Sequence, residues 1–268
     1  MNKIDFFIGP CVLENEKLAM DVAEFLAKNL EEFSDKININ FKGSFDKANR
    51  SSIDSYRGPG IDEGLRILEK VKKEFGFKLI TDFHYPEQAD PVASVIDTIQ
   101  VPAFLCRQTD MIIAGAQACK KYNGRLKVKK GQFLSPYETK NIVDKASSLM
   151  PKENILLTER GTSFGYNNLV VDMASFQIMK SFGVKTIHDA THCVQMPGGL
   201  GSSTGGKRDQ IFTLARAAAA AGADGFFMEA HPNPENALSD ATSQLPLESI
   251  KPLIESIIRI KEVCHEFK

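Results

Sequence analysis

The chain lacks an excess of either charge and any long apolar segment. Its 33 lysine and arginine residues nearly balance 34 aspartate and glutamate residues, which gives a formal net charge of −1. A chain without a global charge presents no electrostatic case for binding nucleic acid or an anionic membrane, so its basic residues must act locally. No run approaches about 18 uninterrupted apolar residues, so the sequence predicts no membrane-spanning helix.

A paired cysteine framework and a secretion signal are missing as well. The five cysteines are scattered along the chain: Cys11, Cys106, Cys119, Cys193 and Cys264. This odd, dispersed set favours reduced thiols over disulfides. The start of the chain holds only a short apolar patch at 6–8, too short for the core of a signal peptide. We therefore expect a soluble, cytoplasmic protein.

Short apolar or alternating runs recur along the chain, and helical patterns separate them. The runs predict strands near residues 5–9, 37–42, 78–83, 97–102, 126–130, 154–159, 184–190 and 225–230. The clearest helix, 61–75, carries an apolar stripe and is followed by Gly76 as a cap. Further helices are predicted over 15–30, 209–221 and 247–266.

This alternation predicts an α/β fold with parallel strands, because parallel strands need crossover connections. A doubly wound open sheet and a (β/α)8 barrel both satisfy the pattern. The number of strands and the polar residues just past many strand ends favour the barrel, since barrels build their sites at that face. No linker or shift in composition divides the chain, so we expect residues 1–268 to form a single (β/α)8 TIM-barrel domain.

The segment KANRSS, residues 47–52, carries the most informative chemistry. It lies in the loop between the predicted strand 37–42 and the helix that opens near Gly60. Its lysine, asparagine, arginine and serines suit a phosphorylated sugar, because Arg and Lys bind phosphate oxygens while Asn and Ser bind neutral oxygens. One such loop alone could equally be solvated surface. Similar groups at other strand ends favour a binding role.

Five cations follow the predicted strands: Lys42, Lys47, Arg50, Lys130 and Arg160. If they converge on one rim, they repel each other unless anions bind among them. Two phosphate-bearing ligands, or one such ligand and a carboxylate, would neutralise the cluster. The alternative is that each cation pairs with a nearby acid such as Asp46, Asp82 or Glu159.

A second group of residues at strand ends has the chemistry of metal ligands. Its members are Cys11, His192, Glu229 and Asp240. Thiolate, imidazole and carboxylate together suit a borderline divalent ion such as Zn, Fe, Mn or Co. The spacing matches no compact motif, so alternatives stay open: Cys11 as a small buried apolar residue, or His84, His188 or His231 as ligands.

A glycine-rich stretch after the seventh predicted strand needs separate treatment. Residues 201–207 match the GxxxxGK pattern of a phosphate-binding loop, but Arg208 stands where a magnesium-binding Ser or Thr is required. The stretch also begins well past its strand. We expect a mobile lid over a site at 195–208 instead of a nucleotide-binding loop.

Several motifs lie in order along essentially the whole chain. They are GPCVLE, FKGSFDKANRSS, TDFH, IQVPAFLCRQTD, VKKGQFLSP, ERG, DATHCVQ, the PGG-to-GGKR loop and FFMEAHPNPENALSD. Together they resemble the family of 3-deoxy-D-manno-octulosonate 8-phosphate synthases. KANRSS is the most discriminating motif, because the related 3-deoxy-D-arabino-heptulosonate 7-phosphate synthases carry a Lys-Pro-Arg-Thr type motif there.

The resemblance implies a barrel, usually a homotetramer, that condenses phosphoenolpyruvate with D-arabinose 5-phosphate and water and releases phosphate by C–O cleavage. The product feeds the inner core of lipopolysaccharide in a Gram-negative-type cytoplasm. The metal-independent branch of the family has Asn in the GPC segment. This chain has Cys at that position, so the resemblance implies that it binds one divalent metal ion. The implied ligands are Cys11, His192, Glu229 and Asp240. A heptulosonate synthase using erythrose 4-phosphate and a non-catalytic sugar-phosphate-binding barrel are the alternatives.

The resemblance also implies a role for each matching residue. Ten residues are implied to bind substrates: Lys42, Lys47, Asn49, Arg50, Ser51, Ala103, Arg107, Lys130, Arg160 and Gln195. Four are implied to be catalytic: Lys130, Asn49, His188 and Asp240. Lys130 and Arg160 are expected to hold the phosphate of phosphoenolpyruvate, and Arg50 with Ser51 the phosphate of the sugar. Arg107 is expected to reach a neighbouring subunit's site.

Overall fold

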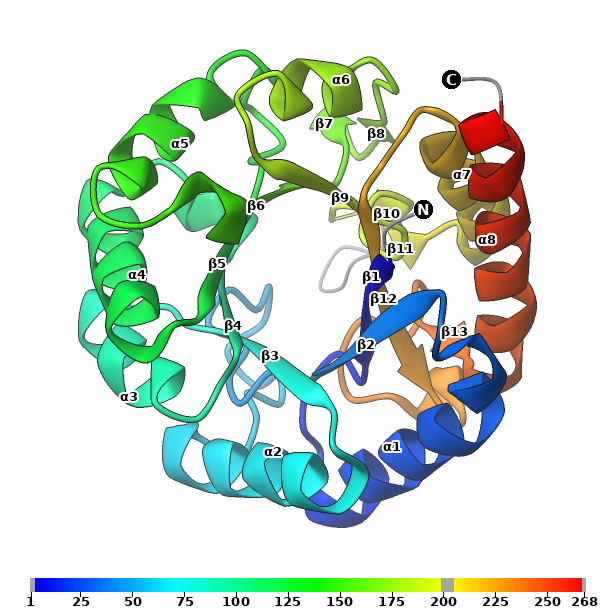
Figure 1. The fold of residues 1–268 in the computed structure, drawn as a ribbon. Helices are drawn as coiled ribbons and strands as arrows, with labels where there is room; N and C mark the ends of the chain where they lie inside the picture. Colours follow the sequence, from blue (N-terminus) through cyan, green and yellow to red (C-terminus); the bar gives the residue numbers. More distant parts are fainter. Residues whose placement is uncertain (1–2, 199–204, 267–268) are drawn as a thin grey trace.

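Eight parallel strands close into a barrel that helices surround (Figure 1). The computed structural model describes residues 3–198 and 205–266. The barrel strands are β1 (Ile4–Gly9), β2 (Ile37–Lys42), β3 (Lys78–Asp82), β4 (Thr98–Val101), β5 (Arg125–Lys129), β6 (Ile155–Glu159), β9 (Lys185–Asp189) and β12 (Gly225–His231). Neighbours pair in this order, and β12 returns to pair in parallel with β1. That closure confirms the (β/α)8 barrel and excludes the open sheet.

Helices separate the barrel strands. They are α1 (Glu16–Leu30), α2 (Ile61–Phe75), α3 (Ala89–Ala93), α4 (Thr109–Tyr122), α5 (Thr139–Ser147), α6 (Ser175–Lys180), α7 (Ile211–Ala220) and α8 (Ile250–Glu266). Four of them lie where the sequence predicts helices: α1, α2, α7 and α8. Asn15 caps α1, because its side chain accepts a hydrogen bond from the backbone N–H of Leu18 at 2.8 Å. Gly76 ends α2 at a φ of 71°, which a residue without Cβ adopts readily.

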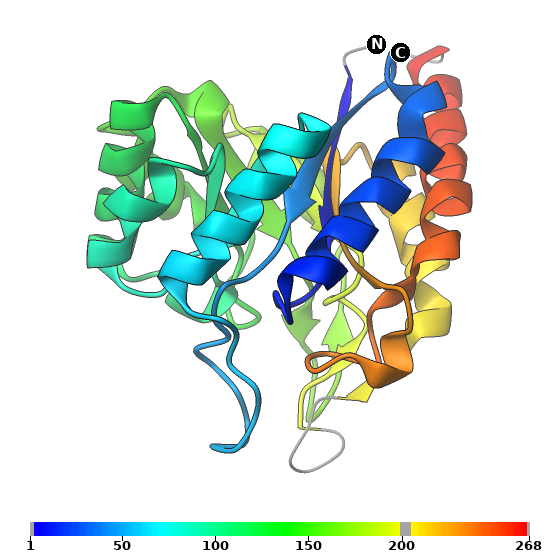
Figure 2. The same ribbon diagram turned by 90° about the horizontal axis from the view of Figure 1, so that it is seen from below.

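Long loops follow the carboxyl ends of the strands and gather on one side of the barrel, away from both termini (Figure 2). They contain short pairings that periodicity did not predict. The small strands are β7 (Thr162–Ser163) with β8 (Leu169–Val170), β10 (Gln195–Met196) with β11 (Gly205–Gly206), and β13 (Leu245–Pro246), which pairs in parallel with the end of β12. Of the predicted lid at 195–208, residues 199–204 lie outside the described residues.

Alternation along the barrel strands decides which side chains face the interior. Five residues form an apolar belt across the barrel, separate from the main core: Phe7, Ile80, Leu156, Ile187 and Phe227. Two positions further along their strands, Ile80, Ile187 and Phe227 are followed by Asp82, Asp189 and Glu229. Because strand side chains alternate with a period of two, these acids face the same interior. The interior therefore changes from apolar to charged toward the carboxyl ends.

An ion cluster around the buried Asp5 lies at the amino-terminal end of the barrel. Asp5 is 3% exposed and lies 3.2 Å from both Arg125 Nη1 and Lys185 Nζ. Arg125 also donates to Asn40 Oδ1 at 2.6 Å. This end is thus built for stability, as is usual for the face of a barrel opposite its site. Within the described part of the chain, no helix is long and apolar enough to cross a membrane.

Candidate active site

A cavity of about 410 Å³ opens at the carboxyl ends of the strands. It is lined by nine of the residues that the sequence singled out: Lys47, Asn49, Arg50, Ser51, Ala103, Arg160, His192, Gln195 and Asp240. These residues come from loops spread over the whole chain, and the closed barrel brings them to one place. Lys42, Cys11 and Glu229 are buried at 0–1% exposure. Cys11 contacts Asp240 and Glu229 contacts Lys47 of this lining, while Lys42 connects to it through Glu229.

Lys130 does not reach the cavity, which corrects its expected placement. It is fully buried and faces away from the barrel axis, with Nζ 3.3 Å from Glu159 and 2.9 Å from Thr162 Oγ1. Its neighbour Lys129 lines the cavity instead. Since Lys127 and Lys129 share the inward parity of β5, Lys130 has the wrong parity for a site residue.

His188 does not reach the cavity either. It has outward parity on β9 and packs edge-on against Phe176 of α6 and Phe226 of β12, at centroid distances of 5.8 and 6.2 Å. Burial lowers the pKa of His188 to about 4, although Asp189 opposes the shift. The side chain is therefore a neutral core histidine. The structure places His188 outside the cavity lining, and its contact with Cys193, at 3.8 Å, adds no exposed group. Its catalytic role stays a prediction that this placement does not support.

Arg107 is exposed and is not among the residues that line the cavity. It follows the short 3₁₀ helix Ala103–Leu105, in which Ala103 and the exposed Phe104 do line the cavity. The expected role of Arg107 toward a neighbouring subunit is thus compatible with its position at the outer rim. A role within its own chain's cavity is not.

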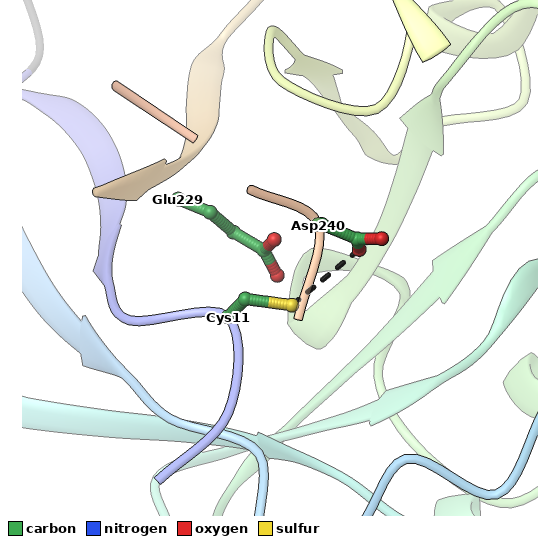
Figure 3. Close-up of side chains that lie close together, drawn as sticks. All are labelled: Cys11, Glu229 and Asp240. Atoms are coloured by element: carbon green, nitrogen blue, oxygen red, sulfur yellow. Dashed lines mark hydrogen bonds between the residues drawn. The ribbon is translucent and has the colours of Figure 1, made fainter. Parts of the chain in front are cut away.

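The predicted metal ligands do converge. Cys11, Glu229 and Asp240 offer donor atoms that all lie within 4.8 Å of one another, and Figure 3 shows their side chains pointing toward a common point. His192 Nε2 lies 3.4 Å from Glu229 Oε2 and 3.5 Å from Asp240 Oδ2. The fourth predicted ligand, in the turn after β9, therefore lies beside the same two carboxylates.

One orphaned atom tests whether these residues fit a metal ion. Glu229 is 1% exposed, yet its Oε2 makes no hydrogen bond with the described residues; the cation that faces it there is His192 Nε2, in an ion-pair contact at 3.4 Å. A buried carboxylate oxygen without a donor is costly unless a cation occupies its open side. Thiolate, imidazole and two carboxylates suit a borderline divalent ion. The donor set and the orphaned oxygen therefore fit a metal ion.

The electrostatics of the cluster favour positive charge at its centre. Burial opposes ionisation of Glu229, but His192, Lys42 and Lys47 hold its pKa at about 2. Burial likewise works against protonation of His192, while Asp189 and Glu229 raise its pKa above the usual range. Burial raises the pKa of the Cys11 thiol, and Glu229 adds to the effect. A bound cation reverses that last effect, because metal ligation deprotonates a thiol.

A second layer of contacts orients the ligands. His192 Nδ1 lies 3.0 Å from Asp189 Oδ1, and Asp189 Oδ2 lies 2.7 Å from Lys129 Nζ. This carboxylate fixes which ring nitrogen faces the cluster, an arrangement typical of metal-binding histidines. Lys42 Nζ lies 2.5 Å from Glu229 Oε1, so the other carboxylate oxygen remains turned to the cluster. The sequence prediction gave neither Lys129 nor Asp189 a role, although period-two parity points both side chains into the barrel.

The cations divide into paired and available ones. Of the five predicted cations, Lys130 pairs with Glu159, and Lys42 and Lys47 pair with Glu229, as the alternative of acid pairing expects. Asp46 is held by Arg57 through two contacts of 2.6 Å. Arg160 donates from Nη2 to Gln195 at 2.8 Å, while its Nη1 is buried without an acceptor among the described residues. Open guanidinium donors in a cavity favour an anionic ligand.

The comparisons with known proteins agree over the whole chain. A sequence profile of the DAHP synthetase I family matches residues 2–263. A curated relative from Geobacter sp. (strain M21), named 2-dehydro-3-deoxyphosphooctonate aldolase, is 51% identical over 96% of this chain and 92% of its own length. A protein of the same name from Campylobacter jejuni is 48% identical over 100% of both chains.

A third relative with this name, from Desulfatibacillum aliphaticivorans, is 49% identical over 96% of this chain and 91% of its own length. The matching family is named after the DAHP synthetases, which are heptulosonate synthases. The three relatives, in contrast, are all named as octulosonate enzymes. The chain therefore belongs to the DAHP synthetase I family and, within it, to the 2-dehydro-3-deoxyphosphooctonate aldolases, also called 3-deoxy-D-manno-octulosonate 8-phosphate synthases.

Proposed function

We propose that this protein condenses phosphoenolpyruvate with D-arabinose 5-phosphate and water to give 3-deoxy-D-manno-octulosonate 8-phosphate and phosphate. The observation that carries the proposal is the cavity itself, because it joins the KANRSS loop to the cluster of Cys11, His192, Glu229 and Asp240. The full-length relatives with this name support the same reading. We also propose that residues 1–268 act as one domain.

Phosphoenolpyruvate is proposed to bind among Lys47, Lys129 and Arg160, with the backbone of Ala103 beside it. All four residues line the cavity. The open Nη1 of Arg160 and the ammonium of Lys129 supply the donors for phosphate and carboxylate oxygens. Lys129 thus takes the role first expected of Lys130. Lys42 does not line the cavity itself and is proposed to support the site through its contact with Glu229.

Arabinose 5-phosphate is proposed to bind along the loop after β2. Asn49, Arg50 and Ser51 line the cavity together with Ser239 and Asp240 from the loop after β12. Arg50 and Ser51 suit the phosphate of the sugar, and Asn49 suits its hydroxyls. The sugar aldehyde then lies toward the cluster around Cys11, and its phosphate toward Arg50.

One divalent metal ion, with Zn, Fe, Mn and Co as candidates, is proposed to be held by Cys11, His192, Glu229 and Asp240. When bound, it would act as a Lewis acid near the sugar aldehyde or near water, without redox chemistry. In the condensation, carbon 3 of phosphoenolpyruvate bonds to the aldehyde carbon and water adds at carbon 2. Phosphate then leaves with its bridging oxygen.

The chain's own residues perform two tasks in this reaction. First, the cations hold two dianionic substrates side by side, which converts a repelling encounter into a near-attack arrangement. Second, the carboxylates of Asp189 and Glu229 balance the cations, so the positive charge that develops at carbon 2 is not opposed by a bare cationic pocket. Asn49 and Asp240 remain candidates for orienting the sugar during carbon–carbon bond formation.

We propose a homotetramer in the cytoplasm that supplies lipopolysaccharide biosynthesis. Arg107 at the outer rim, beside the 57% exposed Phe104, is placed to reach a neighbouring subunit's sugar-phosphate site. Substitution of Arg107 by Ala should then raise KM for the sugar phosphate without altering the fold. Sedimentation analysis of both forms would show whether the tetramer persists.

The proposed reaction is tested by phosphate release from phosphoenolpyruvate with arabinose 5-phosphate, with erythrose 4-phosphate and with no sugar. Release with arabinose 5-phosphate alone is expected. Preference for erythrose 4-phosphate would make the protein a heptulosonate synthase, and binding without release would make it a sugar-phosphate-binding barrel. Either outcome overturns the proposal.

A further inference from the structure

One buried hydroxyl joins two parts of the site that the chain builds separately. Ser239, in the loop after β12, is 2% exposed. Its Oγ lies 3.1 Å from Cys11 Sγ and accepts a hydrogen bond from Arg50 Nη1 at 2.5 Å. Arg50 belongs to the KANRSS loop and Cys11 to the loop after β1, so this hydroxyl connects the proposed sugar-phosphate subsite with the proposed metal cluster.

Donor and acceptor chemistry gives this connection a direction. A guanidinium has only donors, so Ser239 Oγ must accept from Arg50 and keeps one proton of its own. A thiol can donate to that oxygen, whereas a thiolate can only accept. Ligation of a metal by Cys11 therefore makes Ser239 the donor. The resulting chain runs from Arg50 through Ser239 to Cys11, and each hydrogen bond polarises the next.

Arg50 also has capacity left for a ligand. Its Nη2 donates to the backbone oxygen of Leu238 at 3.3 Å, which holds the guanidinium against the loop. Its Nε is buried and has no acceptor among the described residues. A phosphate at the cavity can take this free N–H without displacing the contact to Ser239. Such a ligand would fix Arg50 in the orientation that turns the Ser239 proton toward Cys11.

We propose that Ser239 is a positioning residue that couples binding of the sugar phosphate at Arg50 to binding of the metal ion at Cys11. This inference rests on the proposed function, because it needs both ligands. The coupling is positive and reciprocal: each ligand tightens the binding of the other by the same factor. Contacts beyond the ligands themselves typically change metal affinity by about 10- to 100-fold.

The test measures the affinity for Co²⁺ by its absorption bands, with and without D-arabinitol 5-phosphate, which lacks the aldehyde that could ligate the metal directly. In the wild-type chain, the sugar alcohol phosphate should lower the Kd for Co²⁺ several-fold. Ser239→Ala should weaken Co²⁺ binding on the order of tenfold and abolish this enhancement. It should also shift the thiolate-to-cobalt charge-transfer band, which a purely structural role would not move.

Ser243→Ala is the matched control, because Ser243 is a nearby buried serine whose hydroxyl donates to the backbone oxygen of Asp240, at 3.4 Å. It should keep the wild-type coupling. Arg50→Met removes the guanidinium that donates to Ser239, so it should lose the coupling while retaining Co²⁺ binding. This variant keeps the inference testable if Ser239→Ala folds poorly.

Coupling that persists in Ser239→Ala overturns the inference while leaving the proposed function intact. Absence of Co²⁺ binding and of phosphate release in the wild-type chain would instead refute the proposed function. The two failures are therefore distinguishable within one set of experiments.

Discussion

Replacing His188 by Leu is expected to remove part of the protein's acid sensitivity. His188 is fully buried between the barrel and α6, and burial lowers its pKa to about 4 from an unperturbed value near 6.5. Between these values the unfolded chain binds a proton that the folded chain excludes, so stability falls as pH falls from about 6.5 to about 4. The unfolding free energy falls by about 1.4 kcal/mol per pH unit over this range, or by about 3 kcal/mol in total.

The assay is chemical denaturation of both proteins at pH 7.5 and pH 5.5. Between these two values, the wild-type protein should lose about 1.4 kcal/mol more unfolding free energy than His188→Leu does. Because the side chain lies outside the cavity, the variant should also keep its rate of phosphate release at pH 7.5. Parallel pH profiles, or a large loss of activity, would refute the placement of His188 as a neutral core residue.

Four further substitutions separate the site from its scaffold. Lys129→Met should lower kcat/KM for phosphoenolpyruvate by orders of magnitude with an unchanged fold. Lys130→Met should instead lower the unfolding free energy by about 3–5 kcal/mol, because it leaves the buried carboxylate of Glu159 without its ion-pair partner. Steady-state kinetics and denaturation of both variants check this. Cys11→Ala should lose most bound metal in elemental analysis, and full metal occupancy would contradict the proposed ligand set. Gly9→Ala should destabilise the barrel by about 1–3 kcal/mol, because its Cβ would lie 1.9 Å from the backbone oxygen of Lys42; an unchanged melting temperature would contradict this.

The fold was predictable from the sequence because its local signals agree with each other. The predicted strand 37–42 and helix 61–75 coincide with β2 (Ile37–Lys42) and α2 (Ile61–Phe75). Apolar periodicity sufficed for these elements, because Ile37, Ile39 and Phe41 alternate along β2 and α2 buries an apolar stripe. The two-residue strands β7 and β8 carry no periodicity, because the geometry of their loop creates them, and no sequence pattern of that length could reveal them.

The site was predictable in its chemistry but not in all its positions. The four proposed metal ligands converge because each lies at the carboxyl end of a barrel strand or in the loop that follows one. Lys130 and His188 were misplaced because a motif match does not register which way a strand residue faces. Counting by twos from the belt residue Ile187 would have placed Asp189 inside and His188 outside. The contact between Arg50 and Ser239 joins residues 189 positions apart, so only the folded chain could show it.

The most direct test of the account measures phosphate release from phosphoenolpyruvate with arabinose 5-phosphate before chelation, after EDTA treatment, and after a divalent ion is restored. The account predicts one phosphate released for each octulosonate 8-phosphate formed, loss of both with EDTA, and recovery of both with the metal. Full activity in the chelated protein would contradict the proposed role of the cluster formed by Cys11, His192, Glu229 and Asp240.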